Sequence, residues 1–237
     1  VEIESDAFED SIIDVLRQVT IPELTQNAAY TVDYVIVNGD TAATHQDSDI
    51  AAASAVHAAK AWDGLRKIAS VATEDASNPD LIPDDLLKVL ALLSLGRNIY
   101  NRRLEDIAMI TSNVAYINYH RAAPLITNDL AGNQSTFQNG FLSNFMGPGN
   151  FQLKDSAVVR TDLNASGVYD GTTTDRTTAL IFNKRSFIVG TKRAVTIKSD
   201  ENIVTDRRRV VLTMRIGFMN KFASTEPDVG EIYNVNA

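Results

Sequence analysis

Apolar residues recur at helical spacing along the first forty positions of the chain. The stripe consists of Phe8, Ile12, Val15, Leu16 and Val19, followed by Leu24, Ala28, Val32 and Val35. This spacing predicts a helix with one buried face. Because proline lacks an amide donor and clashes with the preceding turn, we expect the helix to kink or restart at Pro22. The two halves together predict a helix of about 30 residues, roughly 45 Å long, that stops at Asn38-Gly39.

The middle of the chain predicts shorter elements. We expect a loop passing into weak helix over 40–59, a second helical piece over 58–69, a loop over 73–80 and a helix over 84–95. Pro83 is tolerated in a first helical turn, where Asp84 and Asp85 suit the positive helix N-terminus. The run 107–111 predicts a buried strand, and Ser112 or Asn113 is expected to cap the helix that follows.

The C-terminal third is dominated by strand patterns. Apolar runs predict strands over 179–182, 187–189, 194–197 and 210–214, with an extension of the last to Phe218. Residues 1–5 alternate apolar and acidic side chains and predict a short strand end. The stretch 128–150 is rich in Asn, Gly and Phe and predicts a long loop. Since helices and strands do not alternate regularly, the order predicts an α+β protein with a mixed sheet.

Composition narrows the class of protein. The chain has 237 residues, of which 44% are hydrophobic and 22% charged, as in a globular protein of one or two domains. No apolar run approaches the roughly 18 residues of a membrane-spanning helix. The absence of cysteine excludes disulfides, thiolate metal sites and a cysteine nucleophile. The net charge of -8 argues against a general nucleic-acid binder, although a local basic patch remains compatible with it.

The sequence contains no strong catalytic or metal-binding motif. Ser54, His57 and Asp63 have the residue types of a triad, but no Gly-x-Ser-x-Gly elbow frames any serine. The acidic pairs Glu9-Asp10 and Asp84-Asp85 are accounted for by the helix dipole, and neither has the spacing of a calcium loop. We therefore expect no catalytic residue, no metal site and no cofactor.

Arg207, Arg208 and Arg209 form the most conspicuous charged run. Three interpretations are open: contact with DNA through counterion release, pairing with acidic residues of a neighbouring subunit, and a solvated turn before the next strand. In a chain of net charge -8 we favour subunit contacts over DNA. Phe141 and Phe145 are candidates for the same kind of surface, because aromatic residues are enriched at protein interfaces.

The order of these features resembles the Hong Kong 97-like major capsid proteins of tailed bacteriophages. In that family a long spine helix opens near an acidic pair and ends at an Asn-Gly-Asp-Gly turn, and a Gly-Leu segment leads into the axial domain. Here Glu9-Asp10 matches the pair, Asn38-Gly39-Asp40 the turn and Asp63-Gly64-Leu65 the Gly-Leu segment. Residues 107–121 are similar to a strand–helix unit of the axial domain, and 210–218 to the long final strand of the peripheral domain.

The resemblance implies an α+β capsid fold with a spine helix, a peripheral domain and an axial domain. Residues 1–62 would form the first part of the peripheral domain, 63–180 the axial domain and 181–237 the remaining peripheral strands. It implies a non-enzymatic subunit of an icosahedral phage head that assembles into pentamers and hexamers around double-stranded DNA, which it contacts weakly. Scaffold, portal and decoration proteins are further implied partners, with the virion capsid, assembled in the host cytoplasm without a membrane, as location.

The same resemblance selects candidate residues and shows departures. The candidate subunit-interface residues are Glu9, Asp10, Phe141, Phe145, Arg207, Arg208 and Arg209. The family's N-terminal arm and extended loop are not recognisable, so Val1 is expected just before the spine helix, and Thr41 and Ala42 replace expected glycines. The position of a covalent cross-link in some relatives falls near Asp206, and we do not expect that chemistry here.

Two alternatives stay open at this point. The first is the shell protein of an encapsulin-type nanocompartment, which shares the capsid fold and stores cargo enzymes. The second belongs to another class, a soluble α+β hydrolase with an unidentified site. An encapsidated genome would favour the phage shell and a cargo peptide the encapsulin, whereas loss of turnover on changing His57 or His120 would favour the hydrolase.

Overall fold

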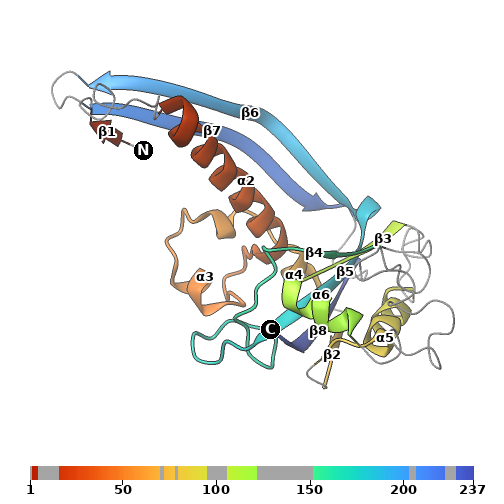
Figure 1. Ribbon diagram of the computed structural model, residues 1–237. Coiled ribbons are helices and arrows are strands. Elements are labelled where there is room, and N and C mark those ends of the chain that lie inside the picture. Colours follow the sequence, from red (N-terminus) through yellow and green to blue (C-terminus); the bar gives the residue numbers. More distant parts are fainter. Residues whose placement is uncertain are drawn as a thin grey trace. The chain divides into compact units, whose positions relative to one another are not determined.

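The computed structural model describes residues 2–4, 16–69, 72–77, 80–94, 106–121, 152–202, 207–221 and 228–237 (Figure 1). The chain divides into two compact units, and both are discontinuous in sequence. Unit 1 comprises Val1–Asp33 and Val189–Phe218, and unit 2 comprises Tyr34–Ile188 and Met219–Ala237. The chain therefore passes between the units three times, at 33/34, 188/189 and 218/219.

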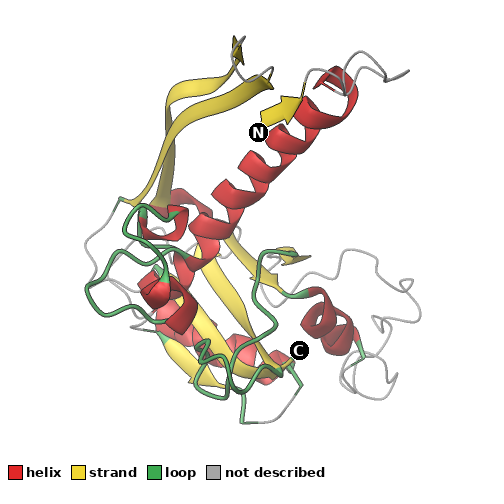
Figure 2. Ribbon diagram, turned by 90° about the vertical axis from the view of Figure 1, so that its left-hand side faces the viewer, coloured by secondary structure: helices red, strands yellow, loops and turns green. Residues whose placement is uncertain are grey.

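The helix of unit 1 restarts next to its proline, as the sequence predicts. A π-helical turn, η1 (Leu16–Thr20), passes into helix α2 (Ile21–Asn38), which is drawn in Figure 2. Pro22 lies at the start of the α-helical part, where its missing amide hydrogen costs least. Leu24, Ala28 and Val32 are half-buried while the residues between them are mostly exposed, which confirms this part of the predicted stripe. Val19, predicted to belong to the stripe, is 49% exposed, so its inclusion is wrong. The predicted first half of the helix, before Leu16, lies outside the described residues.

The sheet of unit 1 has the strand order β1-β7-β6. Its strands are β1 (Glu2–Glu4), β6 (Phe187–Asn202) and β7 (Arg207–Asn220). Strand β1 pairs with β7 in antiparallel register, so that Glu2 lies opposite Arg209 and Glu4 opposite Arg207. The prediction of two separate strands over 187–189 and 194–197 is wrong, because β6 runs on through Gly190. No atom lies within 4 Å of a Cβ placed at Gly190, so nothing there forces a break.

Unit 2 is built on a five-stranded sheet of order β2-β8-β5-β3-β4. The strands are β2 (Thr73–Asp75), β3 (Ile107–Thr111), β4 (Gln152–Asp155), β5 (Arg176–Asn183) and β8 (Val229–Asn236). Pairs β2–β8 and β3–β4 are parallel, whereas β3–β5 and β5–β8 are antiparallel. The mixed sheet and the bounds of β3 confirm the sequence prediction.

Helix α5 (Pro83–Ser94) covers part of this sheet and begins at the predicted proline. Leu86, Val89 and Leu93 are buried in one apolar cluster with Ile232 of β8. A Cβ at Gly230 would lie 2.2 Å from Cγ1 of Val89, so only glycine lets the helix approach the strand this closely. The core of unit 2 therefore lies between α5 and the central strands.

Helix α6 (Asn113–His120) follows β3 directly and begins with the predicted cap. The side-chain oxygen of Ser112 accepts a hydrogen bond from the amide of Ala115 at 3.3 Å, so Ser112 rather than Asn113 caps the helix. Tyr119 of this helix is fully buried in the same apolar cluster. The strand–helix unit is thus anchored at both ends.

Several short elements differ from the prediction. The predicted loop over 73–80 contains β2. The helical piece over 58–69 consists of a 3-10 turn η2 (Ala58–Lys60) and helix α4 (Leu65–Ile68), separated by residues 61–64. The weak helix of 40–59 is the five-residue α3 (Ser48–Ala52). Strands β4 and β8 were not predicted. The predicted loop over 128–150 lies outside the described residues.

Candidate functional site

The two segments that carry the capsid resemblance, at Asn38-Gly39-Asp40 and Asp63-Gly64-Leu65, contact each other in unit 2. The amide of Gly64 donates to the carbonyl oxygen of Gly39 at 2.7 Å. A Cβ at Gly39 would lie 2.4 Å from the carbonyl oxygen of Trp62, and one at Gly64 would lie 2.6 Å from the amide nitrogen of Gly39. Both glycines are therefore required by close backbone packing. The prediction that the helix stops at Asn38-Gly39 did not include this packing.

Thr41, which stands where the family pattern has glycine, ties the same two segments together. Its amide and its hydroxyl donate to one carboxylate oxygen of Asp63, at 2.8 and 2.7 Å. His57 caps the turn η2 through its ring Nδ1, which accepts from the amide of Ala59 at 3.3 Å. Asp63 and His57, two members of the triad considered above, are thus each occupied by local bonds.

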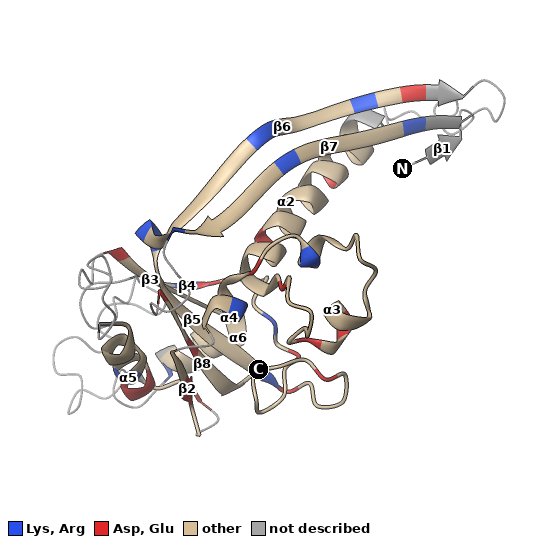
Figure 3. Ribbon diagram, turned by 180° about the vertical axis from the view of Figure 1, so that it is seen from behind, with Lys and Arg blue, Asp and Glu red and all other residues tan. Residues whose placement is uncertain are grey.

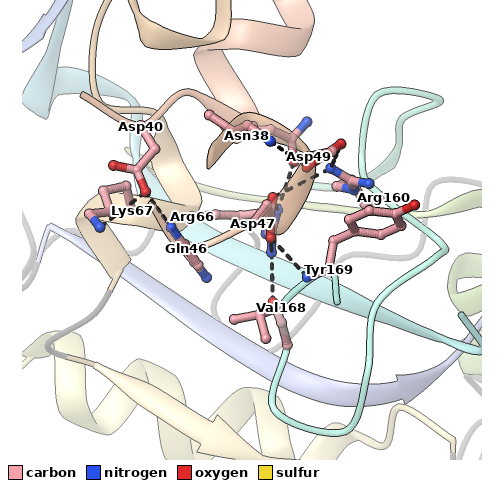
Figure 4. Close-up of polar contacts among 12 residues, drawn as sticks. Asn38, Asp40, Gln46, Asp47, Asp49, Arg66, Lys67, Arg160, Val168 and Tyr169 are labelled. Carbon is pink, nitrogen blue, oxygen red and sulfur yellow. Dashed lines mark hydrogen bonds and ion pairs between the residues drawn. The ribbon is translucent and has the colours of Figure 1, made fainter. Parts of the chain in front are cut away.

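Asp40 is buried beside Lys67 (Figure 4). One carboxylate oxygen accepts from the amide of Ala42 at 2.9 Å. The other accepts from the amide of Gln46 at 2.8 Å and lies 3.1 Å from Nζ of Lys67. Burial by itself raises the pKa of Asp40, but these two amides and Lys67 outweigh it and hold the pKa below its ordinary value. Asp40 is therefore ionised and fixes the loop after α2.

Arg66 of α4 lies at the centre of a second, deeper cluster. Its guanidinium makes a bidentate pair with Asp47 at 2.7 and 3.2 Å. It also donates to the carbonyl oxygen of Gly167 at 2.6 Å and to Oδ1 of Asn38 at 3.3 Å. Its Nε lies 3.8 Å from Oε1 of Glu231. Arg66 thus connects the end of α2, the loop before α3, the 160s loop and strand β8.

Arg160 forms the other half of this cluster. Its Nε and Nη2 each donate to Asp162 at 2.8 Å, while Nη1 donates to Asp49 at 2.8 Å and lies 3.5 Å from Asp47. The guanidinium carbon lies 4.2 Å from the ring centre of Tyr169, a cation–π contact. Burial lowers the pKa of Arg160, but the hydrogen bonds to Asp162 and Asp49 raise it further than burial lowers it.

Asp47 joins the two arginines. It is 1% exposed and also accepts from the amide of Tyr169 at 2.9 Å, so the side chain that precedes α3 does not cap that helix. Removing one partner of such a buried pair leaves an uncompensated charge and costs about 3–5 kcal/mol. We call Asn38, Asp47, Asp49, Arg66, Arg160, Asp162 and Glu231 the buried ion cluster; its centre is buried, while Asp49 and Asp162 at its rim have side chains that are 41% and 43% exposed.

Glu231 is the least well paired member of the buried ion cluster. It lies on β8 between β2 and β5 and is 5% exposed. Burial, opposed by Arg66 and reinforced by Asp47, raises its pKa to about 7. Within the described part of the chain, neither Oε1 of Glu231 nor Nε of Arg66 has a hydrogen-bond partner. The carboxyl is therefore near the midpoint of its titration at neutral pH.

The ion pairs of the cluster hold separate chain segments together. Its arginines and its aspartates are directed at each other, and no group of three or more His, Asp or Glu side chains among the described residues is arranged to hold a metal ion. In the same part of the chain no helix is both long and apolar enough to cross a membrane. What the arrangement does is tie four separate chain segments to the end of α2.

The predicted interface residues are only partly described. Glu9, Asp10, Phe141 and Phe145 lie outside the described residues. Arg207, Arg208 and Arg209 belong to strand β7, so the interpretation of this run as a turn is wrong. In the register of the sheet Arg207 lies opposite Glu4, Arg208 opposite Ile3 and Arg209 opposite Glu2 of β1.

Comparison with known proteins identifies solved structures that share this fold. A scan against protein-family models found no match, and a search of curated proteins found none either. Among solved structures, the chain is similar to the capsid structure of the cyanophage P-SCSP1u, with 14% identity and a TM-score of 0.60 over 100% of this chain and 71% of that one. A chain of the satellite phage P4 procapsid matches with 10% identity and a TM-score of 0.55 over 100% and 74%.

An encapsulin shares the fold as well. The holo-SrpI encapsulin complex from Synechococcus elongatus matches with 12% identity and a TM-score of 0.57, over 100% of this chain and 72% of that one. At these identities the likeness establishes the fold. The chain therefore has the α+β fold of phage major capsid proteins, as the Hong Kong 97-like resemblance predicts.

Proposed function

We propose that this protein is the structural subunit of an icosahedral phage head, which self-assembles into pentamers and hexamers that enclose a double-stranded DNA genome. The observation that carries the proposal is the similarity to capsid structures along the whole chain. Its mechanism is symmetric association of identical chains, without a chemical step. The buried ion cluster serves this role by giving each copy the same rigid loops.

The proposal includes a division of labour within the subunit. Residues 1–62 and 181–237 form the peripheral domain and 63–180 the axial domain. The chain does divide into two compact units, but with other bounds: residues 34–62 and 219–237, including strand β8, belong to the unit built on the five-stranded sheet. The candidate interface residues Glu9, Asp10, Phe141, Phe145 and Arg207–Arg209 belong to the same proposal.

Partners and location follow from this function. The DNA contacts are weak and non-specific, as expected of a chain with net charge -8. Scaffold, portal and decoration proteins are the further partners. The protein is placed in the virion capsid, with assembly in the host cytoplasm and no membrane.

An encapsulin-type shell is the second candidate, and the match to the SrpI encapsulin is the observation that favours it. Both candidates predict closed particles, so the content of the lumen separates them. Nuclease-resistant DNA inside particles purified from infected or induced cells supports the phage head. A cargo enzyme held by a short peptide supports the nanocompartment.

Negative-stain electron microscopy of the purified protein, with size-exclusion chromatography over a range of concentrations, tests the shell function itself. We expect rings of five or six subunits or closed particles. A protein that stays monomeric at every concentration contradicts the proposal. Turnover of a hydrolysable substrate that is lost on replacing His57 or His120 would instead support the hydrolase interpretation.

A further inference from the structure

Positive charge is concentrated on one part of the chain. Residues 189–218 contain seven Lys and Arg and three Asp and Glu, a net charge of +4, whereas the other 207 residues contain 15 basic and 27 acidic residues, a net charge of -12. The basic segment consists of most of β6 and β7, and Figure 3 shows Lys and Arg along both strands. We call the part of β6 and β7 over 189–218 the basic ribbon. Its charge is opposite in sign to that of the rest of the molecule.

Strand β6 of the basic ribbon is open to solvent, whereas β7 is partly covered, since Val210 and Phe218 are only 2% and 8% exposed. Between 188 and 200, every residue of β6 except the half-buried Ile197 is exposed, on both faces of the strand. The exposed basic side chains are Lys192, Arg193, Lys198, Arg209 and Arg215. Apolar side chains are interspersed with them: Val189, Val195 and Val211 are 56%, 46% and 43% exposed. A surface that mixes arginine with exposed aliphatic side chains is typical of protein interfaces.

Strand β6 also has an open backbone edge. It is the last strand in the order β1-β7-β6, so among the described strands it is paired on one side only. A 16-residue edge strand presents amide and carbonyl groups that a further strand can pair. Beyond the three-residue β1, strands β6 and β7 pair only with each other among the described strands, and a two-stranded hairpin alone is marginally stable. A covering partner would therefore add stability.

We propose that the basic ribbon docks onto exposed acidic side chains of a second copy of this chain. This inference rests on the proposed shell function and names the surface and the charge chemistry of its contact. A protein partner satisfies all three features of the ribbon: its charge, its apolar side chains and its open strand edge. DNA satisfies only the first, and the -12 charge of the remaining chain repels it. The contact is heterologous, because basic side chains meet acidic ones, and such contacts form rings when the rotation between neighbouring copies closes.

Charge reversal tests the inference. In the triple variant K192E/R193E/K198E we expect self-association, measured by sedimentation velocity of the whole chain, to weaken by more than about tenfold. Wild-type association is expected to weaken similarly between about 50 and 500 mM salt, because the Debye length falls from about 14 to about 4 Å. Lys154→Glu, at an exposed lysine of β4, is the matched control and should leave association unchanged.

Complementation identifies the partner surface. Asp84 and Asp175 have side chains that are 67% and 65% exposed. Mixing the triple variant with a D84K or D175K chain should restore association that neither variant shows alone. Circular dichroism of each variant establishes that it is folded, and a variant that is unfolded is replaced by K192Q/K198Q, for which a smaller loss is expected.

The outcomes separate this inference from the shell function. Wild-type particles with unchanged assembly in the triple variant overturn the docking surface and leave the shell proposal standing. Ribbon-dependent, salt-sensitive association without rings or closed particles supports docking and contradicts the shell. Unchanged association together with lost binding to a short DNA duplex, measured by fluorescence anisotropy, assigns the ribbon to DNA instead. A wild-type chain that never associates refutes both proposals.

Discussion

Replacing Glu231 by glutamine probes the buried ion cluster, because it removes one ionisable group at nearly constant volume. The pKa of Glu231 is raised from 4.5 to about 7 by burial. Between these two pH values the folded state binds a proton that the unfolded state has lost, so the free energy of unfolding falls as pH rises. The contribution is fully present below pH 4.5 and is lost as pH rises through 7. At 1.36 kcal/mol per pKa unit, the loss amounts to roughly 3 kcal/mol.

Glu231→Gln cannot titrate, so we expect it to escape this loss. At pH 8 the variant should be more stable than the wild type by roughly 2–3 kcal/mol, and the difference should shrink towards zero near pH 4.5. Urea unfolding at several pH values measures this, with the fluorescence of Trp62, the single tryptophan, reporting on unit 2. The exposed Glu23→Gln is the matched control, with an expected change within about 0.5 kcal/mol.

The opposite result would refute the reasoning. A variant that is less stable than the wild type at pH 8 would mean that ionised Glu231 is stabilised by Arg66 across 3.8 Å more than it is destabilised by burial. A difference that does not depend on pH would mean that Glu231 does not titrate between 4.5 and 7. In either case Arg66 would have two carboxylate partners in place of Asp47 alone.

Two further substitutions test the contacts around the end of α2 by the same urea assay. Gly64→Ala should lower the free energy of unfolding by at least about 2 kcal/mol, because its Cβ would meet the Gly39 nitrogen at 2.6 Å. Gly190→Ala, the control with open space around it, should change the free energy of unfolding by no more than about 0.5 kcal/mol, and equal effects of the two substitutions would contradict the packing argument. Asp47→Ala should lower the free energy of unfolding by roughly 3–5 kcal/mol, because it leaves Arg66 and Arg160 short of a partner. Asp175→Ala, at an exposed site, should change it very little. A small loss for Asp47→Ala would show that the cluster repacks.

Local signals in the sequence predicted the elements whose causes are local. The proline and acids at 83–85 predicted the start of α5, and Ser112 predicted the cap of α6 after a strand of alternating burial. The sequence did not predict strand β8, because Gly230 and Glu231 interrupt its apolar pattern. Both are there for tertiary reasons, one to admit Val89 of α5 and the other facing Arg66.

The sequence did not predict the buried ion cluster either, for a related reason. Arg66 pairs with Asp47 at a separation of 19 residues and bonds to Gly167 at 101, while Arg160 pairs with Asp49 at 111. No spacing in one sequence marks such partners, because the contacts exist only after the fold has brought the segments together. By contrast, the resemblance to phage capsid proteins singles out Gly39 and Gly64 in the sequence. The reason for them, close backbone packing, depends on the three-dimensional structure.

The three places where the chain passes between its two units have a mechanical consequence. Each lies inside a regular element: 33/34 within α2, 188/189 within β6 and 218/219 within β7. None lies in a glycine- or proline-rich linker of the kind that lets domains swivel freely. Any adjustment between the units must therefore bend a hydrogen-bonded helix and two strands together.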